Sequence, residues 1–416
     1  MRQHKYHILI LWLSLVFNAM GQEPALPHPE EPVVEDSASF LFASLMIAEP
    51  SHEHVQSVEG HAFLRLQCPS ADLDFCFSME SGNYESFLDI CIGNYPNRLA
   101  IVPTPQYMET FNQEGRIVTE YPLNLSREEI QRLWKFLDNT SAQGLSPYHD
   151  YFHHGCSQEI IRYLTLNLDG DLVYGEAAKA YGNTIFTIGN QGLPPNSWVH
   201  LTSLLFTTDG TDRRLTDAEK TAIPHFIPGL LSDAVIEAPD GSRRPIFKDE
   251  SPIVHEPAQH FAPNTAPPIY VWFVLLLALV VAISILETWW PERPICWLAS
   301  ATDGVLFTLY NLIFVVTLLV CIFSSLPTTS GWNWNYLIYN PIPLAIWLWS
   351  KWHPQSMCKR ANTYIYYALW LAAFMVAMLI VGDHFLIEQY LLTLTFTTRC
   401  LFKAYQHKQA KSISNS

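Results

Sequence analysis

The chain has 416 residues and carries 39 acidic against 24 basic side chains, for a formal net charge of −15. Nearly all the carboxylates precede residue 270, whereas the segment after it is mostly apolar and aromatic. An acidic half without a patch rich in lysine and arginine argues against a nucleic-acid partner. The same division predicts an N-terminal soluble domain followed by a membrane domain.

The N-terminus has the pattern of a signal peptide. A basic start is followed by an apolar core at 8–17 and by small residues at 19–21. The core is about half of the roughly twenty residues that a transmembrane helix needs. We therefore predict a signal peptide at 1–21 and an exported domain at 22–237, with an uncleaved membrane anchor as the alternative.

The exported domain begins with strand patterns. Residues 60–66 alternate between apolar and polar, as a half-buried strand does, and 73–79 is the predicted hairpin partner across a turn at 68–72. Residues 116–121 predict another strand. An apolar run at 38–48 has no clear period.

Helix patterns follow the strands. Ser126 and Glu129 have the spacing of a capping box, and apolar residues continue at helical spacing after them. A second helix is predicted over 157–166. Strands that precede helices, with long loops between them, indicate an α+β domain.

Four cysteines precede the membrane segment: Cys68, Cys76, Cys91 and Cys156. Exported cysteines often form disulfides. The candidates are a Cys68–Cys76 bridge across the predicted hairpin and a Cys76–Cys91 bridge, and the sequence leaves both open. Either pairing leaves Cys156 free, which makes it a candidate for chemistry.

Cys156 lies at the predicted start of a helix, where unpaired N–H groups and a partial positive charge stabilise a thiolate and lower its pKa. A nucleophilic thiol needs a base, and His61 at the head of a strand is the candidate. The same N–H groups would serve as an oxyanion hole. The alternative is that Cys156 is a small core residue and His61 a turn residue.

A metal site is a second alternative for this segment. Four potential ligands fall within eight residues: His149, His153, His154 and Cys156. Pro147 and Gly155 indicate a loop there, whereas a catalytic zinc site requires well-spaced ligands with further support. We expect neither a metal nor another cofactor.

The C-terminal region predicts a transmembrane bundle. A segment at 238–268, rich in proline and charge, is predicted to be a linker, and 269–402 holds the apolar residues. The apolar stretches are 269–287, 304–326, 334–350, 363–382 and 385–402. Their lengths predict an all-α bundle of about five helices, followed by a tail at 403–416.

Charge sets the orientation of this bundle. The loop after the third stretch and the tail contain Lys and Arg, whereas the outer connections at 327–332 and 382–384 contain none. By the positive-inside rule the tail is cytoplasmic and the N-terminal domain is periplasmic. We expect a multi-pass protein of a bacterial inner membrane.

Several segments together resemble the Bacteroides-type lipoprotein N-acyltransferases (Lnb). They are residues 44–50 (SLMIAEP), 60–62 (GHA), 114–118 (EGRIV), 123–126 (LNLS), 212–213 (DR), 226–228 (FIP), 333–336 (NWNY) and 340–341 (NP). Residues 148–157 are similar to the family's aromatic-rich approach to an Asn-Cys-Ser. The chain departs from the family pattern at His154-Gly155, where the family has Asp-Asn.

The resemblance implies a circularly permuted papain-like (NlpC/P60-like) domain, in which the strand that bears His61 precedes the helix that bears Cys156. It implies transfer of a fatty acyl chain from a phospholipid donor, through a Cys156 thioester, to the α-amino group of an apolipoprotein acceptor. The third catalytic member should lie on the strand after His61. Ser78 and Cys76 are the small polar groups there, and neither is assigned.

Two other functions are compatible with the sequence. One is a papain-like cell-wall amidase or peptidase, although no wall-binding module is recognisable in the sequence. The other is a non-catalytic carrier of lipid or lipoprotein, which the change to His154-Gly155 keeps open.

Overall fold

A computed structural model describes most of the chain beyond the N-terminus. The described residues are 39–51, 57–81, 96–144, 150, 152, 154–260, 267–324, 326, 331–352, 357–381 and 385–414. The predicted signal peptide at 1–21 lies outside them.

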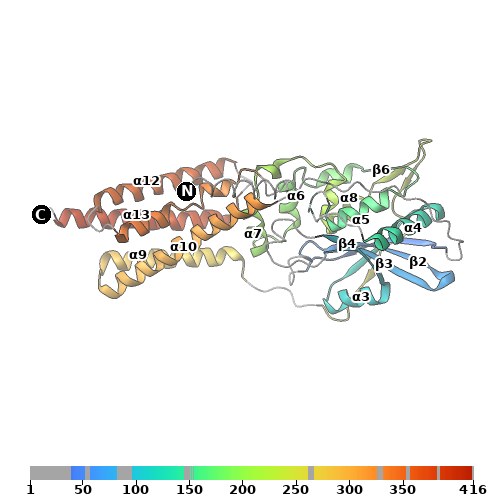
Figure 1. The fold of residues 1–416 in the computed structure, drawn as a ribbon, viewed down its shortest axis with the longest axis horizontal. Helices are drawn as coiled ribbons and strands as arrows, with labels where there is room; N and C mark the ends of the chain where they lie inside the picture. The colour runs from blue at the N-terminus through green and yellow to red at the C-terminus, as the bar shows by residue number, and fades with distance from the viewer. Residues whose placement is uncertain are drawn as a thin grey trace, which may run out of the picture. The chain divides into compact units, whose positions relative to one another are not determined.

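The N-terminal domain is built on a six-stranded antiparallel sheet of order β4-β3-β2-β1-β5-β9 (Figure 1). The strands are β1 (Phe42–Ala48), β2 (His61–Cys68), β3 (Leu73–Ser81), β4 (Asn97–Pro103), β5 (Val118–Pro122) and β9 (Ile253–His255). The three predicted strands are confirmed as β2, β3 and β5, and the apolar run without a clear period is β1.

Helices cover both faces of this sheet (Figure 1). Helix α3 (Thr104–Gln113) packs on one face, where the ring of Phe111 stacks on that of Phe63 at 5.3 Å. Helices α4 (Arg127–Gln143) and α5 (Cys156–Thr165) lie on the other side, and α5 contacts β2 and β3. Because side chains alternate along a strand, His61 shares the α3 face with Phe63.

The two predicted helices have the expected starts. The Ser126 hydroxyl accepts the N–H of Glu129 at 3.1 Å, and the Glu129 carboxylate accepts the N–H of Ser126 at 2.7 Å, so the capping box forms. Helix α5 begins at Cys156, one residue before the predicted start. The domain is a mixed sheet and helix structure, as predicted.

The Cys68–Cys76 disulfide, one of the two candidates, does not form. Both thiols are free, and Cys68 pairs with Leu73 while Cys76 pairs with Arg65. This register directs the two cysteines to opposite faces of the hairpin, because side chains alternate along each strand. Cys91, the other candidate partner of Cys76, lies outside the described residues.

Shorter elements complete this domain. A second sheet has the order β6-β7-β8, and β8 and β9 both fall within the segment predicted as a linker. The elements are β6 (Asp171–Val173), β7 (Val235–Glu237), β8 (Arg243–Pro245), α6 (Ile185–Gly192), α7 (Trp198–Phe206), α8 (Ile227–Leu230), and the 3₁₀ turns η2 (Pro69–Ala71), η3 (Glu176–Ala180), η4 (Asp209–Asp212), η5 (Glu219–Ala222) and η6 (Pro224–Phe226). Strand β9 forms the outer edge of the main sheet, against β5.

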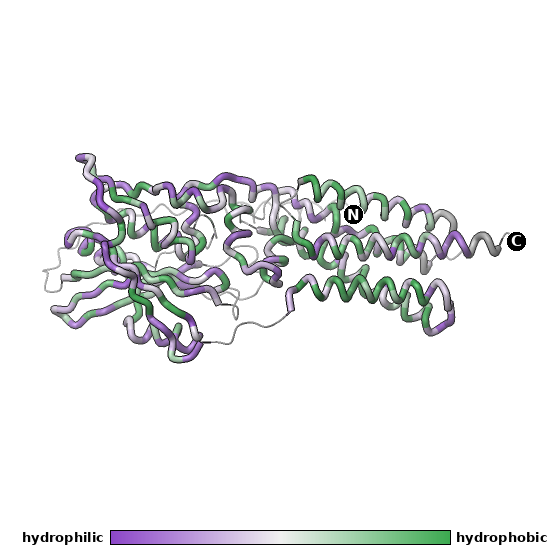
Figure 2. Tube along the Cα trace, turned by 180° about the vertical axis from the view of Figure 1, so that it is seen from behind, coloured by the Kyte–Doolittle hydropathy of each residue, from purple (hydrophilic) through white to green (hydrophobic). Residues whose placement is uncertain are grey.

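Among the described residues, the predicted apolar stretches overlap helices α9 to α13, and Figure 2 shows how strongly hydrophobic this region is. These helices are α9 (Ile269–Trp289), α10 (Arg293–Phe323), α11 (Ile342–Trp352), α12 (Met357–Val381) and α13 (Ile387–Ser414), with the turn η7 (Trp334–Leu337) before α11. Among the described residues, three helical segments are long and apolar enough to cross a membrane: 269–289, 293–323 and 361–380. The 11 residues of α11 extend only about 16 Å, since a helix rises 1.5 Å per residue.

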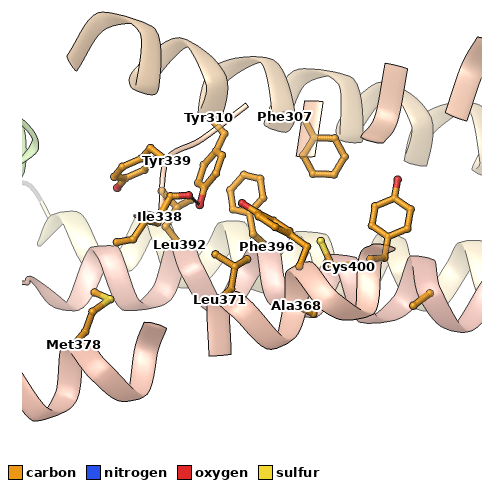
Figure 3. Packing of buried hydrophobic residues seen from close by; sticks show 13 residues of the cluster. Phe307, Tyr310, Ile338, Tyr339, Ala368, Leu371, Met378, Leu392, Phe396 and Cys400 are labelled. Carbon is orange, nitrogen blue, oxygen red and sulfur yellow. Dashed lines mark hydrogen bonds between the residues drawn. The ribbon is translucent and has the colours of Figure 1, made fainter. Parts of the chain in front are cut away.

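Aromatic side chains fill the space between these helices (Figure 3). Tyr310 on α10 lies against Phe396 on α13, with ring centroids 3.9 Å apart, and Tyr339 after η7 packs on Tyr310 at 5.2 Å. Leu371 of α12 is fully buried in the same cluster. The cluster therefore joins three helices and the η7 segment into one core.

A buried ionic cluster joins α9, α10 and α13. Arg399, 1% exposed, binds Asp303 through Nε at 2.5 Å and Nη2 at 2.9 Å, and its Nη1 donates to Ser284 at 2.8 Å. Lys403 lies 2.8 Å from Glu287 and 3.0 Å from Asp303. Two cations thus balance two carboxylates.

Side-chain amides connect the bundle to the N-terminal domain. Asn333 donates to the carbonyl of Leu205 and Asn335 donates to that of Leu204, each at 2.8 Å, and both carbonyls belong to α7. Gln389 on α13 in turn donates to Asn335 Oδ1 at 2.6 Å. These bonds connect α7 to the η7 segment directly and to the start of α13 through Asn335.

Replacing Arg399 by Met should destabilise the bundle by about 3–5 kcal/mol, because it leaves two buried carboxylates against one lysine. Thermal unfolding in detergent measures the effect. Arg293→Met is the matched control, since Arg293 is exposed and makes no ion pair with another described residue. The double variant Arg399→Met, Asp303→Leu should recover part of the loss, and equal melting temperatures for all variants would contradict this role.

Candidate active site

The side chain of His61 is held at one end of the sheet. Its Nε2 lies 2.7 Å from Ser78 Oγ and 3.2 Å from the Tyr107 hydroxyl. Ser78 donates to Glu80 Oε1 at 2.8 Å, and Tyr107 donates to the same oxygen at 2.5 Å. Two strands and helix α3 thus supply a connected network around one ring nitrogen.

Counting protons in this network assigns the state of the ring. The Ser78 proton is donated to the Glu80 carboxylate, and the single Tyr107 proton lies within reach of Glu80 Oε1 at 2.5 Å and of Ser78 Oγ at 2.9 Å. With its own proton on Glu80, the Ser78 oxygen accepts from His61 Nε2–H. The neutral ring then carries its lone pair on Nδ1, which makes no hydrogen bond with another described residue. In this tautomer Nδ1 is the ring nitrogen that can accept a proton.

Burial and the neighbouring charges shift the pKa of His61. Burial lowers the pKa of His61 below its ordinary value; Arg116 adds to the effect and Glu80 opposes it. Burial alone would raise the pKa of Glu80, but His61 and the bonds from Tyr107 and Ser78 outweigh it, so this pKa is lowered. Glu80 is thus ionised at neutral pH, 3.9 Å from the imidazole.

Cys156 is the first residue of α5, and the segment around it is fixed by hydrogen bonds. Asn97 at the start of β4 donates to the carbonyl of His154 at 2.7 Å. Gln158 donates to the carbonyls of Phe152 and Glu219, and Ser157 donates to that of Ala222. The bond from Asn97 brings the start of α5 to the end of the sheet where β3 and β4 pair through Glu80 and Arg98.

The departure at His154-Gly155 is accommodated locally. Gly155 is the N-cap of α5 and has no side chain to cap the helix, but the Gln158 side chain accepts the Gly155 N–H at 3.4 Å. His154 Nδ1 lies 3.0 Å from Glu159 Oε1. The helix start is thus held by side chains of its own first turn.

The expectation of a lowered Cys156 pKa is wrong. Burial raises the pKa of this thiol to about 11, and the nearby Glu80 and Glu59 carboxyls add to the effect. The backbone N–H groups of Ser157 and of Cys156 itself act on the sulfur in the opposite direction and do not compensate. The sulfur therefore rests as a thiol at neutral pH.

Glu59 is a second acidic group near Cys156. It is 7% exposed, and burial raises its pKa to about 8. One of its oxygens lies 3.0 Å from where a Cβ on Gly192 would be, so Gly192 leaves room for this carboxyl. The backbone of Glu59 is fixed by His225 Nδ1, 2.8 Å from its carbonyl.

The two predicted site residues thus lie in one region, but no hydrogen bond between His61 and Cys156 occurs within the described residues. The residue that links them is Glu80, which is close enough to act on the titration of both. Sequence reasoning missed Glu80 and Tyr107. Glu80 carried a signal, because it follows Ser78 by two residues and so shares its face of the strand.

The metal alternative receives no support from the part of the chain that the structure describes. His149 and His153 lie outside it, and within it no group of three His, Cys, Asp or Glu side chains is placed to hold an ion.

Alkylation of Cys156 by iodoacetamide should be slow at neutral pH and should rise towards pH 11, because burial disfavours the thiolate. In urea-unfolded protein the alkylation rate of Cys156 should reach half its maximum near pH 9, because 9 is the ordinary pKa of a cysteine thiol. Mass spectrometry of the Cys156 peptide against pH measures both curves. A plateau at or below pH 8 in the folded protein would contradict the assignment.

Comparison with known families places the chain. The family model described as the Lnb N-terminal periplasmic domain matches residues 38–181, and that described as the Lnb transmembrane domain matches residues 260–411. No curated protein and no solved structure gives a match. The two matches and the apolar helices indicate an inner-membrane protein with an N-terminal periplasmic domain, consistent with a lipoprotein-modifying membrane protein. The chain belongs to the Lnb family.

Proposed function

We propose that this protein is a lipoprotein N-acyltransferase whose periplasmic domain is a permuted papain-like domain, with Cys156 as nucleophile and His61 as base. The observation that carries the proposal is the hydrogen-bonded network of His61, Ser78, Glu80 and Tyr107, which leaves Nδ1 of the ring as the base at the end of the sheet where α5 begins. Glu80 is the third, orienting member of the site.

In the first transfer, Cys156 Sγ attacks the ester carbonyl of a phospholipid while its proton passes to His61 Nδ1. The N–H groups at the start of α5 stabilise the oxyanion. When the carbon–oxygen bond breaks, the imidazolium returns the proton to the lysophospholipid, and the acyl chain remains as a thioester on Cys156.

In the second transfer, the neutral α-amine of a diacylglyceryl-cysteine attacks the thioester, and His61 accepts the proton that the amine loses. The carbon–sulfur bond breaks, the amide forms, and the proton returns to the sulfur. Glu80 stabilises the imidazolium in both steps, because it is an ionised carboxylate 3.9 Å from the ring.

The raised pKa of Cys156 fits this sequence of steps. A resting thiol is weakly nucleophilic, so attack requires simultaneous proton transfer to His61. Both substrates are anchored in the membrane, and the bonds from Asn333 and Asn335 to α7 attach the periplasmic domain directly to the bundle. A cell-wall amidase with a soluble substrate would have no use for this attachment.

Replacing Cys156 by Ala should leave lipoproteins with a free α-amine, because the only sulfur that holds the thioester is lost. Mass spectrometry of lipoprotein N-termini, in cells without another N-acyltransferase, measures this. If the protein were a cell-wall amidase, cells with the Cys156→Ala variant would accumulate uncut wall peptides and their lipoproteins would be N-acylated normally. If it were a carrier, the variant would change neither the wall peptides nor lipoprotein N-acylation. Normal N-acylation by the Cys156→Ala protein would refute the proposal.

Replacing Glu80 by Gln should lower kcat/KM by about 10²-fold or more, since the imidazolium loses its counter-charge. Glu80 raises the pKa of His61, so its loss should also move the acidic limb of the pH profile to lower pH. Tyr107→Phe is the matched control: it removes the hydroxyl that contacts Glu80, Ser78 and His61 but keeps the Glu80 charge, so the loss should be smaller than that of Glu80→Gln. An acidic limb that stays in place would contradict the role of Glu80.

A further inference from the structure

The carboxylate of Glu388, in the first turn of α13, is buried without a partner. The residue is 1% exposed, and neither carboxylate oxygen has a hydrogen-bond partner among the described residues. Glu287 and Asp303, on α9 and α10, are instead paired with Arg399 and Lys403. An ionised carboxylate removed from water requires a cation or donors.

Capping of the helix does not explain Glu388. The Gln389 side chain performs that task, because its Oε1 accepts the N–H of Leu386 at 2.8 Å while its Nε2 donates to Asn335. In α4, by contrast, the first-turn Glu129 is itself the group that binds the N-cap N–H. The carboxylate of Glu388 is therefore not used by the start of its own helix.

The position of Glu388 is at the periplasmic end of the bundle. Its neighbour Gln389 bonds Asn335, which bonds the carbonyl of Leu204 in the periplasmic domain. The first basic residue further along α13 is Arg399, roughly 16 Å away along the helix axis at 1.5 Å per residue. The outer connections at 327–332 and 382–384 contain no Lys or Arg, and His384, the one histidine in them, lies outside the described residues. Within the described residues no Lys, Arg or His side chain pairs with this carboxylate, which leaves the position open to a cation from a ligand.

We propose that Glu388 binds the primary ammonium group of a membrane-anchored substrate at the periplasmic boundary of the bundle. Two such groups are available: the ethanolamine head group of a donor phospholipid and the α-ammonium of the acceptor diacylglyceryl-cysteine. The identity of these two ligands rests on the proposed function, whereas the lack of a partner for Glu388 does not. A cation at this position is bound by charge-assisted hydrogen bonds to both oxygens.

Binding is measured on the full chain carrying Cys156→Ala, so that no probe is consumed. The protein is placed in phosphatidylglycerol nanodiscs, and bound probe is quantified by native mass spectrometry. One pair of probes is phosphatidylethanolamine and its N-acetylated form. The other pair is a diacylglyceryl-cysteine peptide with a free or an acetylated α-amine. Each pair differs only in the ammonium group.

Glu388→Gln should weaken binding of a free-amine probe about tenfold or more, as expected for the loss of a charge-assisted bond, and leave its acetylated counterpart unchanged. The pair that responds identifies the substrate. Glu388→Asp keeps the charge and should retain most of the binding. Glu292→Gln, at an exposed carboxylate before α10, is the matched control and should change nothing.

Equal binding of free-amine probes by the parent and Glu388→Gln would overturn the proposal. So would equal losses for free and acetylated probes, or the same loss in Glu388→Asp, because each indicates a packing role. Failure of the proposed function would appear separately, as absence of turnover by the protein with Cys156 intact, and would not alter these binding ratios.

Discussion

The pairing register of β2 with β3 is the constraint on which the site depends. Leu64 pairs with Phe77 and Leu66 with Phe75, and Ala62, Leu64 and Leu66 are fully buried. A slip of one residue would turn this apolar row away from the core, so burial specifies the register strongly. The same register puts His61 on one face with Ser78 and Glu80. The geometry around His61 is thus a consequence of the hydrophobic packing of neighbouring residues on the same two strands.

The electrostatic environment of Cys156 disfavours a thiolate in the resting protein. Burial and the acidic neighbours Glu59 and Glu80 hold Cys156 as a thiol, and the helix start does not compensate. In the proposed mechanism this thiol is activated when His61 takes its proton.

The local features of the fold could be predicted from the sequence. The alternation of 60–66, the Ser126–Glu129 capping box and the helix that begins at Cys156 all depend on neighbouring residues, and all are present. Features that depend on distant residues could not be predicted. Tyr107 reaches the network from α3, a helix with no side-chain cap at its start. The direction of the Cys156 pKa shift could not be predicted either, because the sequence indicates that Cys156 starts a helix but not that its sulfur is buried.

The central claim is that Cys156 carries an acyl chain. Its most direct test is the intact mass of the purified full-length protein after incubation with phosphatidylethanolamine and without an acceptor. We predict a gain of one fatty acyl chain that maps to the Cys156 peptide, is released by neutral hydroxylamine and disappears when an acceptor peptide with a free α-amine is added. An unmodified Cys156 under conditions in which the protein N-acylates the acceptor peptide would contradict the account.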